Sequence, residues 1–343
     1  MKQDDRRSAV QMTALLSIMH MITDFLCALT MTAGVVSQTM GLNELVLYNF
    51  CAFALQMPFG IAADRLSAYD GGRERTARLT VLAGVVLTLA GCFLGPAVLG
   101  TGNALFHVGG GMITIRRDDA CGFRGRGLGV FVAPGAVGLA CGAILADPSK
   151  MWLPAAVLVV LVFCVLMEKG QSAGIQSIDP DVLLSRSVWI SAALLSAVVV
   201  IRSAASLAMQ FPWKSAPYTI ILAACASALG KAAGGFVSAS LGYRRAAAVS
   251  LLASAVCFIA GANMICGLAG LLFFNMTMPM TLYGLKQKMP SMPGFAFGIL
   301  TFALFIGYLP AVSGLFDAVS SVVLGAGASL VSLVLLLAEG RKE

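Results

Sequence analysis

Apolar segments of about twenty residues follow one another along the whole chain, separated by short polar connections. A segment of about this length spans a bilayer as an α-helix, and the alternating pattern of an outer-membrane barrel strand is absent. We therefore expect an all-α polytopic membrane protein with twelve transmembrane helices. The expected spans are residues 11–36, 43–63, 79–95, 97–115, 127–146, 151–167, 187–208, 215–240, 246–263, 266–285, 293–314 and 319–338.

Composition supports a membrane protein and excludes a soluble domain. Of 343 residues, 59% are hydrophobic and 11% charged, and the mean hydropathy is +0.89. The net charge of +7 comes from basic residues in the connections, so it encodes topology and predicts no nucleic-acid partner. Nine cysteines without a CxxC motif are interpreted as packing residues. No cofactor or metal site is expected, and the chain should be a monomer in the lipid bilayer.

The basic residues predict the orientation, because Lys and Arg collect on the cytoplasmic side. With a cytoplasmic N-terminus, 19 of the 23 basic residues fall in inner segments. Lys150 and Lys214 lie in outer connections, and Arg202 and Lys231 lie within spans. We therefore expect both termini in the cytoplasm. The pattern and the short connections are typical of a bacterial inner (plasma) membrane.

The chain divides near its middle. We expect an N-terminal six-helix bundle over residues 1–168, a cytoplasmic linker over 169–186 and a C-terminal six-helix bundle over 187–343. The ends of spans two and eight form a faint internal repeat. Two bundles of six helices are the arrangement of transporters that rock about a central site.

A Gly-x-x-x-Asp-Arg pattern closes span two, with Gly60, Asp64 and Arg65 followed by a basic connection. Glycine lets helix ends approach closely, and an acid there can meet a neighbouring helix terminus. The pattern resembles the cytoplasmic loop motif of the major facilitator superfamily, although Ser67 stands where that motif usually has glycine. The resemblance covers the whole chain and implies a gating role for Gly60, Asp64 and Arg65.

Span five carries small residues three to four positions apart and a proline, Pro134. It loosely resembles the glycine-proline signature of antiporters in that superfamily, but the order here is Pro134-Gly135. A helix specialised for close packing is the alternative interpretation.

Ionisable residues within apolar spans are costly and therefore point to function. Span one holds His20 and Asp24 one turn apart, and span four holds Asn103 and His107 one turn apart. These positions resemble the fosmidomycin-resistance branch of the superfamily, although Val108 stands where that branch usually has a proline. The resemblance implies efflux driven by protons. We expect Asp24 with His20 to couple protons, or else to pair structurally, and His107 with Asn103 to bind solute, or else to serve as core residues.

The second half supplies further candidates. Arg202 suits an anionic solute or a partner for Asp24, unless it extends to the outer surface. Lys231 is a weaker candidate for solute binding and could instead be a latch. Gln56, Asn275 and Tyr283 could line a cavity or join helices by hydrogen bonds.

The sequence thus predicts a secondary active transporter, not an enzyme. It would move a small organic solute, an anion being one option, by proton-coupled alternating access in the direction of efflux or antiport. An uptake symporter or a uniporter of an organic anion is the alternative. A membrane-embedded enzyme fits less well, because it would need a nucleophile or metal set at the membrane surface, and two histidines with one buried acid fall short of metal-ligand spacing. No Walker-type loop is present, which argues against ATP-driven pumping.

Overall fold

The computed structural model describes residues 3–70, 74–168 and 185–339, which are helical apart from short connections. Ten helical segments within these ranges have the length and hydropathy to cross a membrane. With α5 (Pro96–Ala120) and α12 (Tyr243–Ile259) they make up the twelve expected spans. The others are α1 (Gln3–Val36), α2 (Leu42–Asn49) with the π-helical turn η1 (Phe50–Ala54) and α3 (Gln56–Ser67), α4 (Arg75–Leu94), α6 (Arg126–Val132) with α7 (Gly135–Leu145), α8 (Trp152–Met167), α10 (Arg186–Ala208), α11 (Pro217–Leu241), α13 (Met264–Asn275) with α14 (Thr277–Lys288), α15 (Pro293–Val312) and α16 (Ser321–Glu339).

The expected all-α membrane fold is confirmed, and the differences concern helix ends and breaks. Helix α1 begins at Gln3 rather than at residue 11, and α5 continues to Ala120 rather than ending at 115. Span five is broken at Pro134, and span ten is broken three residues before Pro279. A proline lacks the N–H that an α-helix needs and crowds the carbonyl four residues earlier, so both breaks have a local cause.

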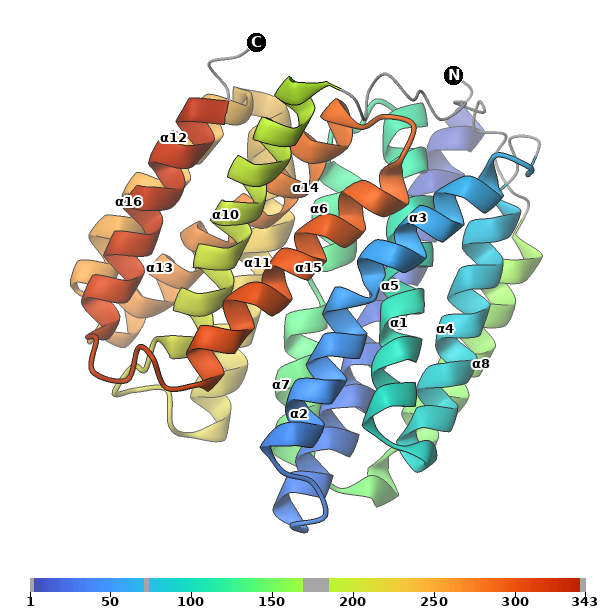
Figure 1. Cartoon of the computed structure of the whole chain (residues 1–343), viewed down its shortest axis with the longest axis horizontal. Coiled ribbons are helices and arrows are strands. Elements are labelled where there is room, and N and C mark those ends of the chain that lie inside the picture. The colour runs from blue at the N-terminus through green and yellow to red at the C-terminus, as the bar shows by residue number, and fades with distance from the viewer. Residues whose placement is uncertain (1–2, 71–73, 169–184, 340–343) are drawn as a thin grey trace.

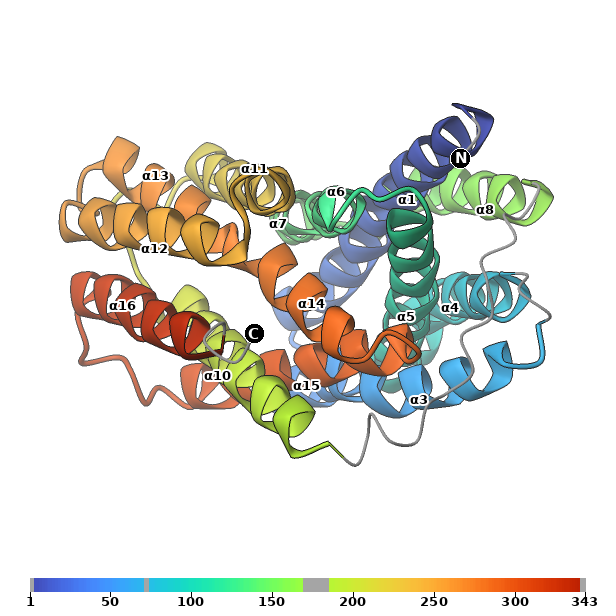
Figure 2. The ribbon, with the colours of Figure 1, turned by 90° about the horizontal axis from the view of Figure 1, so that it is seen from above.

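Helices α1 to α8 and helices α10 to α16 form two groups that lie side by side (Figures 1 and 2). Helices α3, α5, α6 and α7 of the first group contact α11, α14 and α15 of the second. Helix α1 begins and α16 ends at the same end of the molecule, called the terminal end below (Figure 1). The linker expected at 169–186 lies outside the described residues, except for its last two positions.

At the terminal end, one network of charges ties the first group together. Arg117 of α5 is 1% exposed, and its Nη2 lies 2.7 Å from Glu74 Oε2 and 2.8 Å from Glu168 Oε2. Arg78 of α4 reaches the same Glu168 oxygen at 2.5 Å, and Ser8 of α1 donates to the other. Charged pairs therefore join α4, α5 and the end of α8, and the Ser8 hydroxyl adds α1, so the buried charges are paired as burial requires.

Replacing Glu168 with glutamine should lower the thermal stability of the protein. Burial alone would raise the pKa of Glu168, but the hydrogen bonds from Arg117, Ser8 and Arg78 and the Arg117 charge together lower that pKa from 4.5 to about 2. Loss of the charge leaves buried arginine donors poorly paired and should cost about 1–3 kcal/mol. Thermal unfolding in detergent at pH 7 measures this loss.

The same experiment has a pH signature. Because folding lowers the pKa of Glu168, its stabilising contribution is complete above about pH 4.5 and is lost as the pH falls through about 2. Wild type and Glu168→Gln should therefore converge at low pH. Asp317→Asn, at an exposed carboxyl, is the control and should match wild type throughout. An unchanged melting temperature for Glu168→Gln at pH 7 would contradict the prediction.

Candidate functional site

A cavity of about 370 Å³ lies between the two groups of helices. The first group lines it with His20, Asp24, Tyr48, Asn49, Phe53, Gln56, Asn103, His107, Val132, Gly135, Ala136 and Leu139. The second group lines it with Arg202, Ser203, Ser206, Leu207, Lys231, Asn275, Met278, Phe297, Thr301, Leu304 and Tyr308. The structure thus brings together every sequence-predicted binding and coupling residue except Tyr283.

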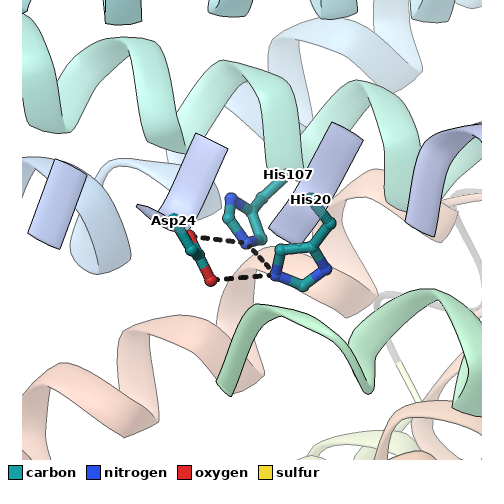
Figure 3. Close-up of side chains that lie close together, drawn as sticks. All are labelled: His20, Asp24 and His107. Atoms are coloured by element: carbon teal, nitrogen blue, oxygen red, sulfur yellow. Dashed lines mark hydrogen bonds and ion pairs between the residues drawn. The ribbon is translucent and has the colours of Figure 1, made fainter. Parts of the chain in front are cut away.

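Three buried side chains meet on the wall formed by α1 and α5 (Figure 3). His20 Nε2 lies 3.2 Å from Asp24 Oδ2 and 2.8 Å from His107 Nε2. His107 Nε2 lies 3.9 Å from Asp24 Oδ1, to which Asn103 donates at 2.9 Å. We call His20, Asp24 and His107 the His–Asp–His cluster. His107 and Asn103, assigned from the sequence to solute binding, therefore contact the predicted coupling pair directly.

Hydrogen bonds on the far side of each ring determine which nitrogen faces the cluster. His20 Nδ1 lies 2.8 Å from the carbonyl oxygen of Phe131, and His107 Nδ1 lies 2.8 Å from that of Asn103. A carbonyl oxygen only accepts, so each Nδ1 carries a hydrogen. In neutral rings, both Nε2 atoms then present lone pairs to one another at 2.8 Å, which is repulsive unless a cation lies between them.

The break at Pro134 supplies one of these carbonyls. Helix α6 ends at Val132, so the carbonyls of its last turn lack helical partners. Ser17 Oγ donates to Val130 at 3.2 Å, and His20 Nδ1 donates to Phe131. Phe131 was missed from the sequence, because it acts through its backbone carbonyl and its side chain type says nothing about that role. The proline inside span five could have indicated a free backbone carbonyl near the polar residues of span one.

Glycines of α7 bring that helix against α1 at the cluster. A Cβ at Gly138 would lie 2.1 Å from the Met21 carbonyl oxygen, and one at Gly142 would lie 2.2 Å from that of Phe25. A Cβ at Gly135 would lie 2.4 Å from His20 Nε2. The small residues of span five therefore perform close packing, which was the second interpretation of that pattern.

The opposite wall carries the two cations. Arg202 of α10 is 5% exposed, and its Nη1 is buried without a hydrogen-bond partner in the part of the chain that the structure describes. The suggestion that it extends to the outer surface is therefore wrong. No ion pair joins Arg202 to Asp24 among the described residues, although both line the cavity with the half-buried Lys231 of α11. Asn275 donates to the Leu271 carbonyl at 2.8 Å and to Ser227 at 3.3 Å.

Two further candidates differ from expectation in what they contact. Gln56 lines the cavity, where its Nε2 donates to the Ala52 carbonyl at 2.6 Å and its Oε1 is buried with no partner within residues 3–70, 74–168 and 185–339. Tyr283 does not line the cavity and instead lies against Gly125, 3.1 Å from the position that a Cβ on Gly125 would take. Ser203 and Thr301 were missed, because single hydroxyls in apolar spans carry no distinctive pattern.

The two groups of helices touch closely at the terminal end. Asp64 of α3 accepts hydrogen bonds from the amides of Gly294 at 3.0 Å and Phe295 at 2.7 Å, the first turn of α15. Gly60 is needed for this approach, since a Cβ there would lie 2.2 Å from the Gly294 carbonyl oxygen. Lys286 of α14 pairs with Asp119 of α5, which is a second link between the two groups. Arg65 is exposed and takes no part in it.

These features define a class of protein. The chain is an integral multi-pass membrane protein with the major facilitator fold, and its polar cavity lies between the two halves of that fold. No family model and no curated protein sequence matches it.

Two solved transporter structures are similar to this chain over nearly its whole length. The chain is similar to the fucose:proton symporter FucP of E. coli, with 13% identity over 97% of this chain and 99% of that one and a TM-score of 0.70. It is also similar to the human organic anion transporter MFSD10, with 14% identity over 99% of this chain and 100% of that one and a TM-score of 0.64. At such identities the likeness concerns the fold.

Proposed function

We propose that the protein is a secondary active transporter that moves a small organic solute across the membrane by alternating access coupled to protons. One observation carries the proposal: the His–Asp–His cluster of one half and Arg202 of the other half line one shared cavity, and Arg202 Nη1 is buried without a hydrogen-bond partner among the described residues. Ionisable groups at membrane depth are functional by default. The fold is also that of a fucose:proton symporter and of an organic anion transporter, which adds support.

The cluster is suited to hold one proton. A proton between His20 Nε2 and His107 Nε2 replaces the repulsion of two lone pairs by a hydrogen bond, and Asp24 at 3.2 Å stabilises the resulting imidazolium. His107 thus joins His20 and Asp24 in proton coupling, and Asn103 positions the carboxylate.

Solute binding belongs to the opposite wall. Arg202 offers a buried donor with no partner, and Lys231 adds a second positive charge. An anionic group on the solute would pair with both positive charges, and a buried cation needs such a partner. Gln56 and Asn275 border the same space and would contribute hydrogen bonds, whereas Tyr283 lies outside the cavity, against Gly125.

In alternating access, the two bundles, residues 1–168 and 187–343, would rock against each other. The protein would lie in a bacterial inner membrane with both termini on the cytoplasmic side. The terminal-end contact of Gly60 and Asp64 with α15 would then be the cytoplasmic gate in its closed state. Export by antiport is the favoured direction, as the likeness of His20, Asp24 and His107 to the fosmidomycin-resistance branch suggests. Uptake by symport is the second candidate, favoured by the shared fold with a fucose:proton symporter.

Proton movement in liposomes tests the function. Purified full-length protein is reconstituted with an interior pH dye, and a panel of small organic anions, cations and neutral solutes is added under a set pH gradient. The expected result is proton flux that depends on one class of solute, with anions favoured. Protein-free liposomes are the control. No solute-dependent proton flux with any class, from protein shown to be folded, would overturn proton coupling.

A further inference from the structure

We propose that the His–Asp–His cluster is also a binding site for a divalent transition-metal ion. His20 Nε2, His107 Nε2 and a carboxylate oxygen of Asp24 would be its three protein ligands. These donor atoms lie within 4.8 Å of one another, and all three residues are buried. The inference concerns the same cluster as the proposed transport, but metal binding needs no gradient and can be tested without transport.

The three ligands are not close together in the sequence. His20 and Asp24 lie on α1, whereas His107 comes from α5. Two ligands one turn apart on a single helix predict no metal centre, which is why none was expected. The packing of α5 against α1 supplies the third ligand, so the set exists only in the folded protein.

The histidines are arranged as metal ligands usually are. A ligating imidazole donates its other N–H to a carbonyl or a carboxylate, which orients the ring and leaves a lone pair for the metal. Here the carbonyls of Phe131 and Asn103 hold the two Nδ1 atoms. Both Nε2 atoms therefore face the same point, and a metal ion placed there removes the same repulsion that a proton would.

The distances require only a small adjustment. Ligand atoms of a tetrahedral zinc site lie about 3.3 Å apart, given Zn–N distances of roughly 2.0–2.1 Å. The separations here are 2.8 Å between the two Nε2 atoms and 3.2 Å from His20 Nε2 to Asp24 Oδ2. Small rotations of the two rings that move each Nε2 atom by a few tenths of an ångström would create room for the ion.

The donor set selects the kind of metal. Two imidazoles and one carboxylate suit Zn²⁺, Co²⁺, Ni²⁺ or Cu²⁺, whereas Mg²⁺ and Ca²⁺ prefer oxygen ligands. Three protein ligands leave a fourth position open, as in sites that exchange a water or substrate ligand. All three residues line the cavity, so this position is reached from it. Asp24 and one anion at that position would neutralise the ion.

The first experiment uses the fact that the chain contains only two histidines, both in this cluster. Full-length, tag-free protein in detergent is loaded with one equivalent of Cu²⁺ and studied by pulsed electron paramagnetic resonance, which detects the remote nitrogen of a coordinated imidazole. Modulation from two imidazoles is expected, and excess Zn²⁺ should remove it. Bound Cu²⁺ without imidazole modulation would assign the metal to cysteines or carboxylates and overturn the proposal.

Variants identify the ligands. His107→Gln should leave the modulation of one imidazole, and the double variant His20→Gln/His107→Gln should leave none. In a Zn²⁺ titration, Asp24→Asn should weaken binding at least about 10-fold. Asp147→Asn, outside the cavity at the connection between α7 and α8, is the matched control and should bind as wild type does. Equal Zn²⁺ affinity of wild type and the double variant would also overturn the proposal.

The outcomes for transport and metal binding are separable. Solute-dependent proton flux without the Cu²⁺ signature would leave the proposed function intact and remove the metal site. The Cu²⁺ signature without any flux would establish the metal site and overturn proton-coupled transport.

Discussion

Asp24→Asn is expected to reduce solute-dependent proton flux by roughly 10²-fold or more, the size associated with losing a positioned proton-transfer group. Asparagine keeps the shape of the side chain but removes the charge 3.2 Å from His20 Nε2. Without that charge, a proton shared by His20 and His107 would be buried in an apolar wall without a counter-ion. The measurement is the liposome assay with the interior pH dye.

Exchange of solute down its own gradient should survive in the same variant, because Arg202 and Lys231 on the opposite wall are unchanged. This separates loss of coupling from loss of the fold. Asp147→Asn is the matched control, since Asp147 accepts a hydrogen bond from the Ser149 amide at 3.0 Å and lies outside the cavity. Full coupled flux in Asp24→Asn would refute the assignment of the cluster to proton coupling.

Gly60→Ala should shift the protein away from the state that is closed at the terminal end. The added Cβ would lie 2.2 Å from the Gly294 carbonyl oxygen, and backbone cannot yield as a flexible side chain can. Overpacking of this kind costs about 1–3 kcal/mol. Because the contact joins the two halves, the cost applies to the closed state and changes the conformational equilibrium about 5- to 150-fold.

Hydrogen–deuterium exchange measures this shift. In the closed state, the amides of Gly294 and Phe295 donate to Asp64. Opening frees them, so peptides covering 289–297 should exchange faster in Gly60→Ala. Gly327→Ala is the control, because a Cβ at Gly327 on α16 meets nothing within 4 Å. Unchanged exchange at 289–297 in Gly60→Ala would exclude Gly60 from the gate.

Local chemistry explains where sequence and structure differ along the helices. Pro134 indicated a bend, but it ends α6 and frees the Phe131 carbonyl for His20. Arg202 was open to two interpretations, since a long basic side chain near a helix end can reach the surface. Its burial beside the cavity depends on how α10 packs on α15, a contact between residues far apart in the chain.

The sequence by itself determined the membrane class, the twelve spans and the residues whose burial would be costly, among them His20, Asp24, His107 and Arg202. These follow from hydrophobic length and from the cost of charge in hydrocarbon, which are properties of each segment alone. Only the tertiary structure decided that His107 joins His20 and Asp24, and that Asp64 binds the first turn of α15. Such contacts depend on the rotation and depth at which helices pack, and the pattern of a single helix does not specify them.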